Sequence, residues 1–400
     1  MEDSYQERVI AIRRRVGGEA PAVIYASMHR SPSWFFKWWA RYEQCGLDGL
    51  KDLPKAPKHQ AHQTSEEIEK AIVTLRTLRE KRDTDETKYA LVGADAIHRE
   101  LRDLGYEPPS VRTVHRVMAR HGLIVPVPEK ERVREIIDRH YPTFEITRPG
   151  QLQQLDFVGP NYLTGSSQKY YFVTLRDVCS RRVALEAGKD RKALTVVGFL
   201  IRAWQKMGIP SLLQHDNGLE FRGSNRYPRS AGLVTKLCLA LGVETLFIPY
   251  RQPQRNGSLE NFNGLFQRLV LKTQKIDDFQ HLQKEVASFE QVANSKHPHI
   301  PLKGKTSLEY ESLVHFVPTL LAEDFTFNSR FRFEEPPDGK VSFICRIRKS
   351  GRITIASEKF EIDAELAWQY VYATIFVKEQ KLKIFHNRKL IKEFDYNLKV

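Results

Sequence analysis

The spacing of apolar residues changes twice along this chain of 400 residues. Up to about residue 125, apolar positions recur every three or four residues, which indicates amphipathic helices. From residue 148, apolar runs of strand length alternate with longer helical stretches, and beyond residue 325 apolar and polar residues alternate one by one. The pattern predicts a multidomain protein with an all-α N-terminal region, a central α/β core and a C-terminal small β-barrel.

Segment 1–52 is predicted to form a helix-turn-helix domain. Its first helix should cover 21–28 and its second about 33–43, with a break between them. In the second helix, the residues spaced to face a core are Trp34, Trp38 and Tyr42. The opposite face would enter a DNA major groove and carries Ser33, Lys37 and Arg41. A plain αα-hairpin with a solvated basic face explains this segment equally well.

A linker rich in lysine and proline, residues 51–63, leads to a second helical domain at 64–125. Thr64 and Glu67 should form a capping box at its first helix. The stripe expected to be buried there is Ile68, Ile72, Leu75 and Leu78.

The rest of 64–125 has a second, winged-helix-like helix-turn-helix pattern, and its last helix should begin after Ser110. The residues that this helix should bury are Val111, Val114, Val117 and Met118. The residues expected to contact DNA are Ser110, Arg112, Thr113 and Arg116. Two tandem modules can read a longer site than one, which favours DNA binding.

A charged stretch with prolines, residues 126–147, is predicted to connect these modules to a core at 148–315. A strand at LQQLDFVG, a hairpin that turns near 179–182, and alternating helices and strands predict one mixed sheet flanked by helices. The small β-barrel is assigned to 325–400, where turns such as KSGR separate short strands. Its outward basic residues would either bind phosphates or keep the unit soluble.

The charge of the chain bears on its partners. A net charge of +14 and a pI near 9.5 indicate a polyanion binder, although other basic proteins share these values. The four cysteines form no CxxC pair, which argues against a zinc knuckle or a disulfide framework. No run approaches the roughly 18 apolar residues of a membrane span, and no secretory signal is recognisable. We therefore expect a cytoplasmic, nucleoid-associated protein.

Three acidic residues of the core are candidates for chemistry on DNA. Breaking or forming a phosphodiester bond requires an activated nucleophile and a stabilised leaving oxygen, and two Mg²⁺ ions about 4 Å apart supply both. Mg²⁺ prefers carboxylate and water oxygens. Asp156 lies within the first predicted core strand, Asp216 ends the strand SLLQH, and Glu260 opens a helix after an Asn-Gly pair.

Each of these acids also has an ordinary explanation. Asp156 could pair with Arg176 or Arg181 across the hairpin. Asp216 could be a turn acid, because Asp-Asn-Gly favours turns, and Glu260 would be stabilised at any helix N-terminus. A further core acid, Asp177, is interpreted as structural. The joint occurrence of the three candidates favours a metal site.

The segments LQQLDFVG, LLQHDNGLEF and PYRQPQRNGSLENFNG occur in this order and resemble the acidic motifs of the DDE transposase and retroviral-integrase superfamily. The resemblance covers residues 145 to about 312 and is closest to insertion-sequence transposases with an integrase catalytic core. It implies a ribonuclease-H-like core in which two Mg²⁺ ions, replaceable by Mn²⁺, are bound by Asp156, Asp216 and Glu260 as catalytic residues. Residues implied to contact the scissile strand are Arg251, Gln254, Arg255 and Asn256. The spacing from the second acid to the third is longer than in the family, and the excess is expected in the loop 222–232.

The resemblance implies a transposase that recognises element ends in double-stranded DNA, hydrolyses at their 3′ ends and joins them to target DNA. Because two ends must be held together, a homo-oligomer on DNA is expected, with no membrane partner. Accessory proteins are unknown. The alternatives are a catalytically silent DNA-binding regulator, against which the three carboxylates argue, and a ribonuclease-H-like nuclease, which the fold permits.

Overall fold

The computed structural model describes residues 2–53, 64–124, 141–142, 144–163, 167–223, 227, 229–250 and 252–400. Its internal contacts divide the chain into two compact units, 1–64 and 65–400. The predicted linker lies almost entirely outside the described residues, and so does most of the predicted connector. None of the helices in the described ranges combines the length and the apolar character that a membrane crossing needs.

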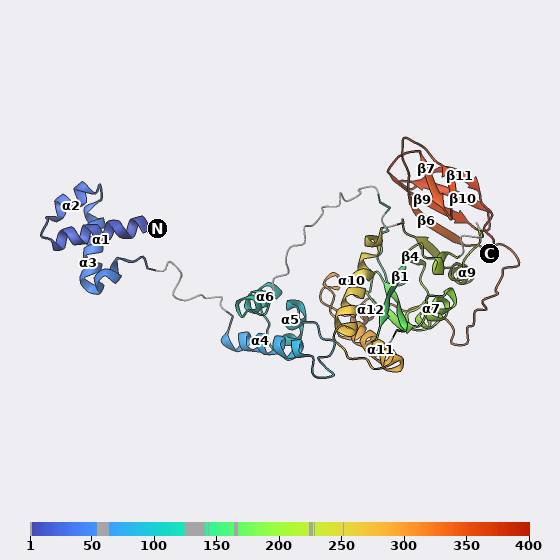
Figure 1. The fold of residues 1–400 in the computed structure, drawn as a ribbon, viewed down its shortest axis with the longest axis horizontal. Helices are drawn as coiled ribbons and strands as arrows, with labels where there is room; N and C mark the ends of the chain where they lie inside the picture. Colours follow the sequence, from blue (N-terminus) through green and yellow to red (C-terminus); the bar gives the residue numbers. More distant parts are fainter. Residues whose placement is uncertain are drawn as a thin grey trace. The chain divides into compact units, whose positions relative to one another are not determined.

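The N-terminal unit is helical (Figure 1). Its elements are α1 (Glu2–Val16), α2 (Pro21–Ser27), α3 (Pro32–Cys45) and a 3₁₀ turn (Gly46–Leu50). Trp38 is buried against α1, and Trp34 and Tyr42 pack beside it, as their spacing predicts. Phe35 is buried as well, because α3 also packs against Ile24 of α2. The predicted helix pair is therefore confirmed, with α1 completing its core.

The larger unit begins with three helices, α4 (Glu66–Lys81), α5 (Ala94–Asp103) and α6 (Val111–Arg120). Ser110 caps α6 as predicted, since its hydroxyl accepts a hydrogen bond from the Thr113 amide at 3.3 Å. The predicted capping box at Thr64 is wrong, because α4 is capped by Ser65, whose hydroxyl accepts from the Ile68 amide.

The buried stripe of α4 is shorter than predicted. Ile72 is buried and Ile68 and Leu75 pack beside it, but the side chain of Leu78 is 47% exposed. With 3.6 residues per turn, Leu78 lies roughly 80° around the helix from Ile68 and leaves the packed face. In α6 the buried residues are Val114, Val117 and Met118, whereas Val111 is only half-buried.

The core is a sheet in the order β3-β2-β1-β4-β5, with helices on both faces (Figure 1). The strands are β1 (Leu152–Tyr162), β2 (Lys169–Asp177), β3 (Val183–Gly188), β4 (Leu212–His215) and β5 (Glu244–Phe247). The first three are antiparallel, and β4 and β5 run parallel to β1. This is the mixed sheet that the sequence predicts.

Two helical layers cover the sheet. One apolar cluster joins its first face to α7 (Ala193–Met207), α8 (Leu219–Arg222) and α9 (Leu233–Ala240). A second cluster joins the opposite face to α10 (Gly257–Phe266), the π-helical segment Gln267–Leu271 and α11 (Phe279–Ser295). After α11 the chain continues through the 3₁₀ turn Ile300–Leu302 to α12 (Ser307–Leu313). Because side chains alternate along β1, Leu155 and Phe157 join the first cluster and Val158 the second. Asp156 therefore belongs to the face that α10 covers.

The C-terminal strands do not form the separate barrel that the sequence predicts. In the described residues, β6 (Lys340–Arg346) pairs in parallel with β5, and the strands β9, β10 and β11 extend the same sheet to nine strands. Their bounds are β9 (Tyr370–Phe376), β10 (Lys381–His386) and β11 (Lys389–Asp395), and a separate hairpin is formed by β7 (Arg352–Ile355) and β8 (Glu358–Glu361). The edge of β5 would otherwise leave unpaired backbone groups, and β6 satisfies them.

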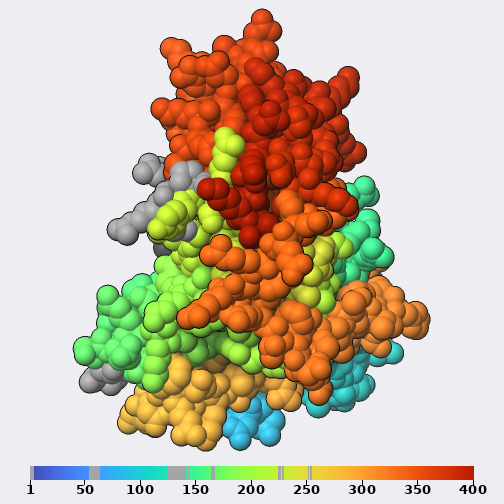
Figure 2. Space-filling view, turned by 90° about the vertical axis from the view of Figure 1, so that its right-hand side faces the viewer, coloured from blue at the N-terminus to red at the C-terminus, as the bar shows by residue number. Residues whose placement is uncertain are grey.

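The predicted loop 222–232 lies partly outside the described residues, and its described end contacts the C-terminal strands. Arg229 Nη2 lies 2.7 Å from Glu358 Oε2, and the Arg229 guanidinium lies over the Tyr396 ring at 4.6 Å. The Ala231 amide donates to the Lys399 carbonyl at 2.9 Å. Figure 2 shows the C-terminal strands, in red, resting on the yellow-green core segment. The extra length in this loop thus joins the C-terminal strands to the core.

Candidate active site

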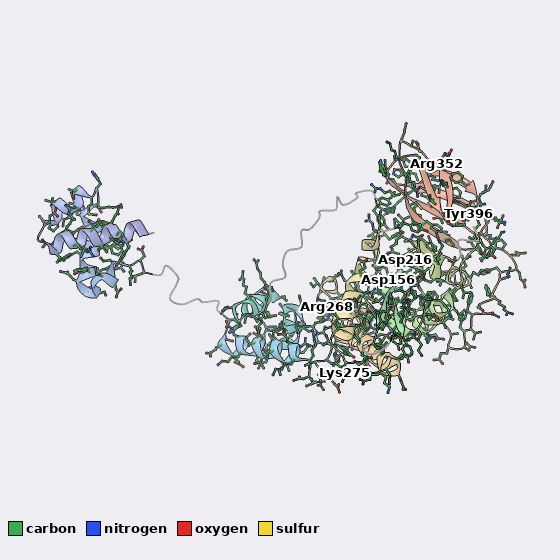
Figure 3. All side chains as sticks on the ribbon, viewed as in Figure 1. Asp156, Asp216, Arg268, Lys275, Arg352 and Tyr396 are labelled. Carbon is green, nitrogen blue, oxygen red and sulfur yellow. The ribbon has the colours of Figure 1, made fainter. Side chains whose placement is uncertain are left out.

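Asp156 and Asp216 come from neighbouring parallel strands. Gln154 of β1 is in register with Gln214 of β4, and each aspartate follows two residues later. Equal offsets from a register pair place both side chains on one face of the sheet, with Asp156 inside β1 and Asp216 just beyond the end of β4. Figure 3 shows the two aspartates together in the core.

Glu260 reaches the same place from α10. It lies in the first turn of this helix, which packs through Leu259 and Phe262 against β1 and β2. One turn later, Asn263 Nδ2 donates to Asp156 Oδ2 at 3.1 Å. The helix face that carries Glu260 is therefore the face that contacts the buried aspartate.

The pKa of Asp156 shows that the three acids share one electrostatic environment. Burial, together with the negative charges of Asp216 and Glu260, raises this pKa to about 6. The Phe157 amide and the Arg191 guanidinium act in the opposite direction. A buried carboxylate beside two other acids is costly unless a cation offsets the charge.

Asp216 also belongs to a turn. Its Oδ1 accepts a hydrogen bond from the Gly218 amide at 2.9 Å, and the Asn217 side chain donates to the Ile248 carbonyl. Next to it, His215 is fully buried against Phe247, and burial lowers its pKa to about 4. Asp216 therefore takes part in a turn and also lies near Asp156.

The alternative ion pairs of Asp156 are not formed in the described part of the chain. Arg176 donates to the Ser258 carbonyl at 2.5 Å, and Arg181 donates to the Ser258 hydroxyl at 2.6 Å. Both arginines thus hold the start of α10. Asp177 has the structural role that the sequence indicates, because it accepts hydrogen bonds from Gly150, Cys179 and Ser180 around the hairpin turn.

The donor chemistry fits a hard divalent cation. The three acids supply carboxylate oxygens, which Mg²⁺ and Mn²⁺ prefer, and no protein cation forms an ion pair with Asp156 within the described ranges. As the side chains stand, the same ranges contain no group of three or more His, Cys, Asp or Glu that closes around an ion. Residues that would hold a metal are therefore Asp156, Asp216 and Glu260.

The loop before α10 is predicted to contact the scissile strand, and its described side chains have partners within the protein. Arg251 and the side chain of Gln254 lie outside the described residues. Asn256 is 3% exposed, and its Oδ1 accepts a hydrogen bond from Gln214 at 2.7 Å. The Arg255 guanidinium lies 3.6 Å from the centre of the Tyr141 ring. Both side chains thus have contacts within the protein, and their contact with DNA stays a prediction.

The predicted DNA-contacting side chains of the helical modules fall into two groups. Those exposed on the surface are Ser33, Lys37, Arg112 and Arg116. Those engaged within the protein are Arg41, which donates to the Lys51 carbonyl and lies over Trp38, together with Ser110 and Thr113, which bond to each other at the start of α6. The exposed group is the one available to DNA.

Two segments match known domain families. Residues 241–306 match a family described as integrase core domain, and residues 34–118 match a homeodomain-like domain. The segment that matches the integrase core domain contains Glu260 and Asn263, and the homeodomain-like match extends from α3 into α6.

Solved structures similar to this chain include retroviral integrases. The HTLV-2 integrase catalytic core domain in complex with magnesium is 18% identical, covers 40% of this chain and 96% of its own, and gives a TM-score of 0.32. The BIV integrase catalytic core domain is 21% identical, with 42% and 97% covered and a TM-score of 0.32. An intasome of simian T-cell lymphotropic virus, solved with the PP2A regulatory subunit B56 gamma, is 15% identical, with 76% and 95% covered and a TM-score of 0.36.

Two residues near the acids of the integrase core domain were missed in the sequence. Asn263 follows Glu260 by three positions, so helical spacing alone could have placed it on the same face. Arg191, which lies over the Phe157 ring and lowers the pKa of Asp156, gave no such signal because it precedes a different helix.

Proposed function

We propose that this protein is a transposase that binds element-end DNA and catalyses 3′-end hydrolysis and strand transfer into target DNA with divalent metal ions. The observation that carries the proposal is the convergence of Asp156 and Asp216, on paired parallel strands, with Glu260 on α10. The integrase core domain and the homeodomain-like match support both parts of this activity, catalysis and DNA binding.

The residues of this chain would hold the metal ions, orient their ligands and bind the DNA. Asp156, Asp216 and Glu260 would bind the metal ions, and Asn263 would fix the carboxylate of Asp156 through its 3.1 Å hydrogen bond. When bound, the metal ions would activate the attacking oxygen and stabilise the leaving oxygen of the phosphodiester. The exposed Lys37, Arg112 and Arg116 would neutralise phosphates of the element end.

Two ends must be cut and joined in one complex, so we propose that the protein acts as a symmetric oligomer on DNA.

The test begins by searching the DNA that flanks the gene for inverted repeats, which the proposal predicts, and uses them as substrate. Purified wild-type protein in Mg²⁺ should nick the repeats at their 3′ ends and join them to a plasmid, and Asp216→Asn should abolish both steps while end binding persists. Asp395→Asn is the matched control, because it makes the same charge change at an exposed acid of β11 that lies far from Asp216 in the sequence. Full strand transfer by Asp216→Asn, or failure of the wild type to bind the repeats, would overturn the proposal.

A further inference from the structure

Arg255 of the loop before α10 lies against a pair of tyrosines from distant parts of the chain. Its guanidinium carbon lies 3.6 Å from the centre of the Tyr141 ring and 5.6 Å from that of Tyr370. The two rings meet edge to face, with centroids 5.2 Å apart. Tyr141 precedes the core sheet, and Tyr370 begins β9 of the C-terminal strands. An arginine between aromatic faces is held by cation–π attraction and by stacking of its planar group.

Hydrogen bonds tie the same loop to Tyr370. Gln252 Nε2 donates to the Tyr370 hydroxyl at 2.6 Å, and Arg255 Nε donates to Gln252 Oε1 at 3.2 Å. The Arg255 amide also donates to the Gln252 carbonyl at 3.1 Å. Tyr370 thus contacts both ends of this short turn.

The other side of the loop is tied to the strands that carry the aspartates. The Arg255 carbonyl accepts hydrogen bonds from Gln154 Nε2 at 3.5 Å and from Gln214 Nε2 at 3.1 Å. Gln214 Nε2 also donates to Asn256 Oδ1 at 2.7 Å. These two glutamines form the register pair that precedes Asp156 and Asp216. The loop is therefore fixed between the aspartate strands and the tyrosine pair.

The position of the loop sets the position of Glu260. The loop ends at Asn256, α10 begins at Gly257, and Glu260 lies in the first turn. No residue of free chain separates the held segment from the helix, so a shift at Arg255 is passed to Glu260.

We propose that Tyr141 and Tyr370 are positioning residues that hold Glu260 toward Asp156 and Asp216 through Arg255. The inference rests on the proposed function of the three acids, and it assigns the C-terminal strands a direct part in forming the active site. Both tyrosines contact the loop, through Arg255 and Gln252. Loss of either ring should therefore change the order of the loop and the affinity for metal.

The experiment compares Tyr141→Leu with Tyr141→Phe, which keeps the ring, and Tyr370→Leu with Tyr370→Phe, which keeps the ring and removes the hydroxyl. Hydrogen exchange of peptides covering 252–263 reports loop order, and titration of free Mn²⁺ by electron paramagnetic resonance reports metal affinity. We expect faster exchange and about tenfold weaker Mn²⁺ binding in both leucine variants, with Tyr141→Phe like the wild type. Tyr370→Phe should lie between, because only the bond to Gln252 is lost.

Arg255→Lys keeps the charge but loses the planar stack, so it should behave like Tyr141→Leu. An unchanged melting temperature identifies a variant that folds. If Tyr370→Leu does not fold, Tyr141→Leu alone tests the inference. Wild-type exchange and wild-type Mn²⁺ affinity in Tyr141→Leu would overturn the inference. If the variants show the expected exchange differences but the wild-type protein never cuts repeat DNA, the result would instead count against the proposed function.

Discussion

Asp156 and Asp216 each lie two residues beyond a pair of glutamines, Gln154 and Gln214, that face each other on parallel strands. Two carboxylates in this relationship meet at the same end of the sheet, where open α/β sheets bind their ligands. Burial raises the pKa of Asp156 to about 6, and the charge of Asp216 contributes to the increase. A metal ion bound by these acids would offset this repulsion.

Asn263→Ala should weaken metal binding without removing a ligand. The change deletes the 3.1 Å hydrogen bond to Asp156 Oδ2, so the carboxylate loses its fixed orientation. Loss of a group that orients a metal ligand typically costs about tenfold in affinity or more. Titration with Mn²⁺ measures the effect, and Asn261→Ala, at an exposed position of the same helix, is the control. Equal affinities in the two variants would show that Asn263 does not orient the site.

The sequence predicted the acids because their signal is local. A strand that ends in an acid, or a helix that begins with one, can be recognised within a few residues, and strand alternation then fixes the face on which Asp156 lies. The core strands and the helix pair at the N-terminus were predicted for the same reason.

The features that were missed depend on partners far away in the sequence. Alternating residues over 340–346 fit a barrel strand and a strand added to β5 equally well, and only the pairing of Val341 with Thr245 distinguishes them. The sequence assigned Arg255 to DNA contact and gave no sign of its contact with Tyr370, which follows Gln252, its hydrogen-bond partner in the same loop, by 118 residues. No local pattern contains that information.

Arg112→Ala and Arg116→Ala should each weaken DNA binding at all sequences and lower its salt dependence. Both side chains are exposed on α6, whereas Arg120, one turn after Arg116, lies 2.8 Å from Glu69. Losing one phosphate contact should reduce the slope of log affinity against log salt by roughly one. Fluorescence anisotropy between about 50 and 200 mM salt measures this slope. Arg120→Ala is the control, and a loss in that variant as large as in Arg112→Ala would contradict the assignment of the DNA-binding face.

Tyr89→Phe should destabilise the attachment of the second helical module to the core. The Tyr89 ring is buried edge-on against Phe289, and its hydroxyl donates to Glu285 Oε2. Removing the donor takes this hydrogen bond from Glu285 Oε2, while Lys88 Nζ stays 2.6 Å from the other oxygen, Oε1, and an unsatisfied buried acceptor costs about 1–3 kcal/mol. Urea unfolding measures the change in the free energy of unfolding. Tyr227→Phe, at a residue 69% exposed, should leave this free energy unchanged, and an equally small effect of Tyr89→Phe would refute the prediction.

The same junction should lose stability as the pH falls. His297 is buried, with Nε2 donating to the Tyr89 carbonyl at 2.8 Å, and burial lowers its pKa from 6.5 to about 4. Above pH 6.5 the imidazole is neutral in both the folded and the unfolded chain, so burial costs no protonation energy. Between pH 6.5 and 4 only the unfolded chain takes up the proton, and stability falls by up to about 3 kcal/mol.

His297→Gln removes this titrating group, so the free energy of unfolding should depend less on pH between 6.5 and 4 than in the wild type. Urea unfolding at several pH values measures the difference in slope. His115→Gln makes the same chemical change at an exposed position of α6 and should retain the wild-type slope. Parallel curves for the wild type and His297→Gln would mean that His297 takes up its proton over the same pH range in the folded and the unfolded chain, and the burial argument would then be wrong.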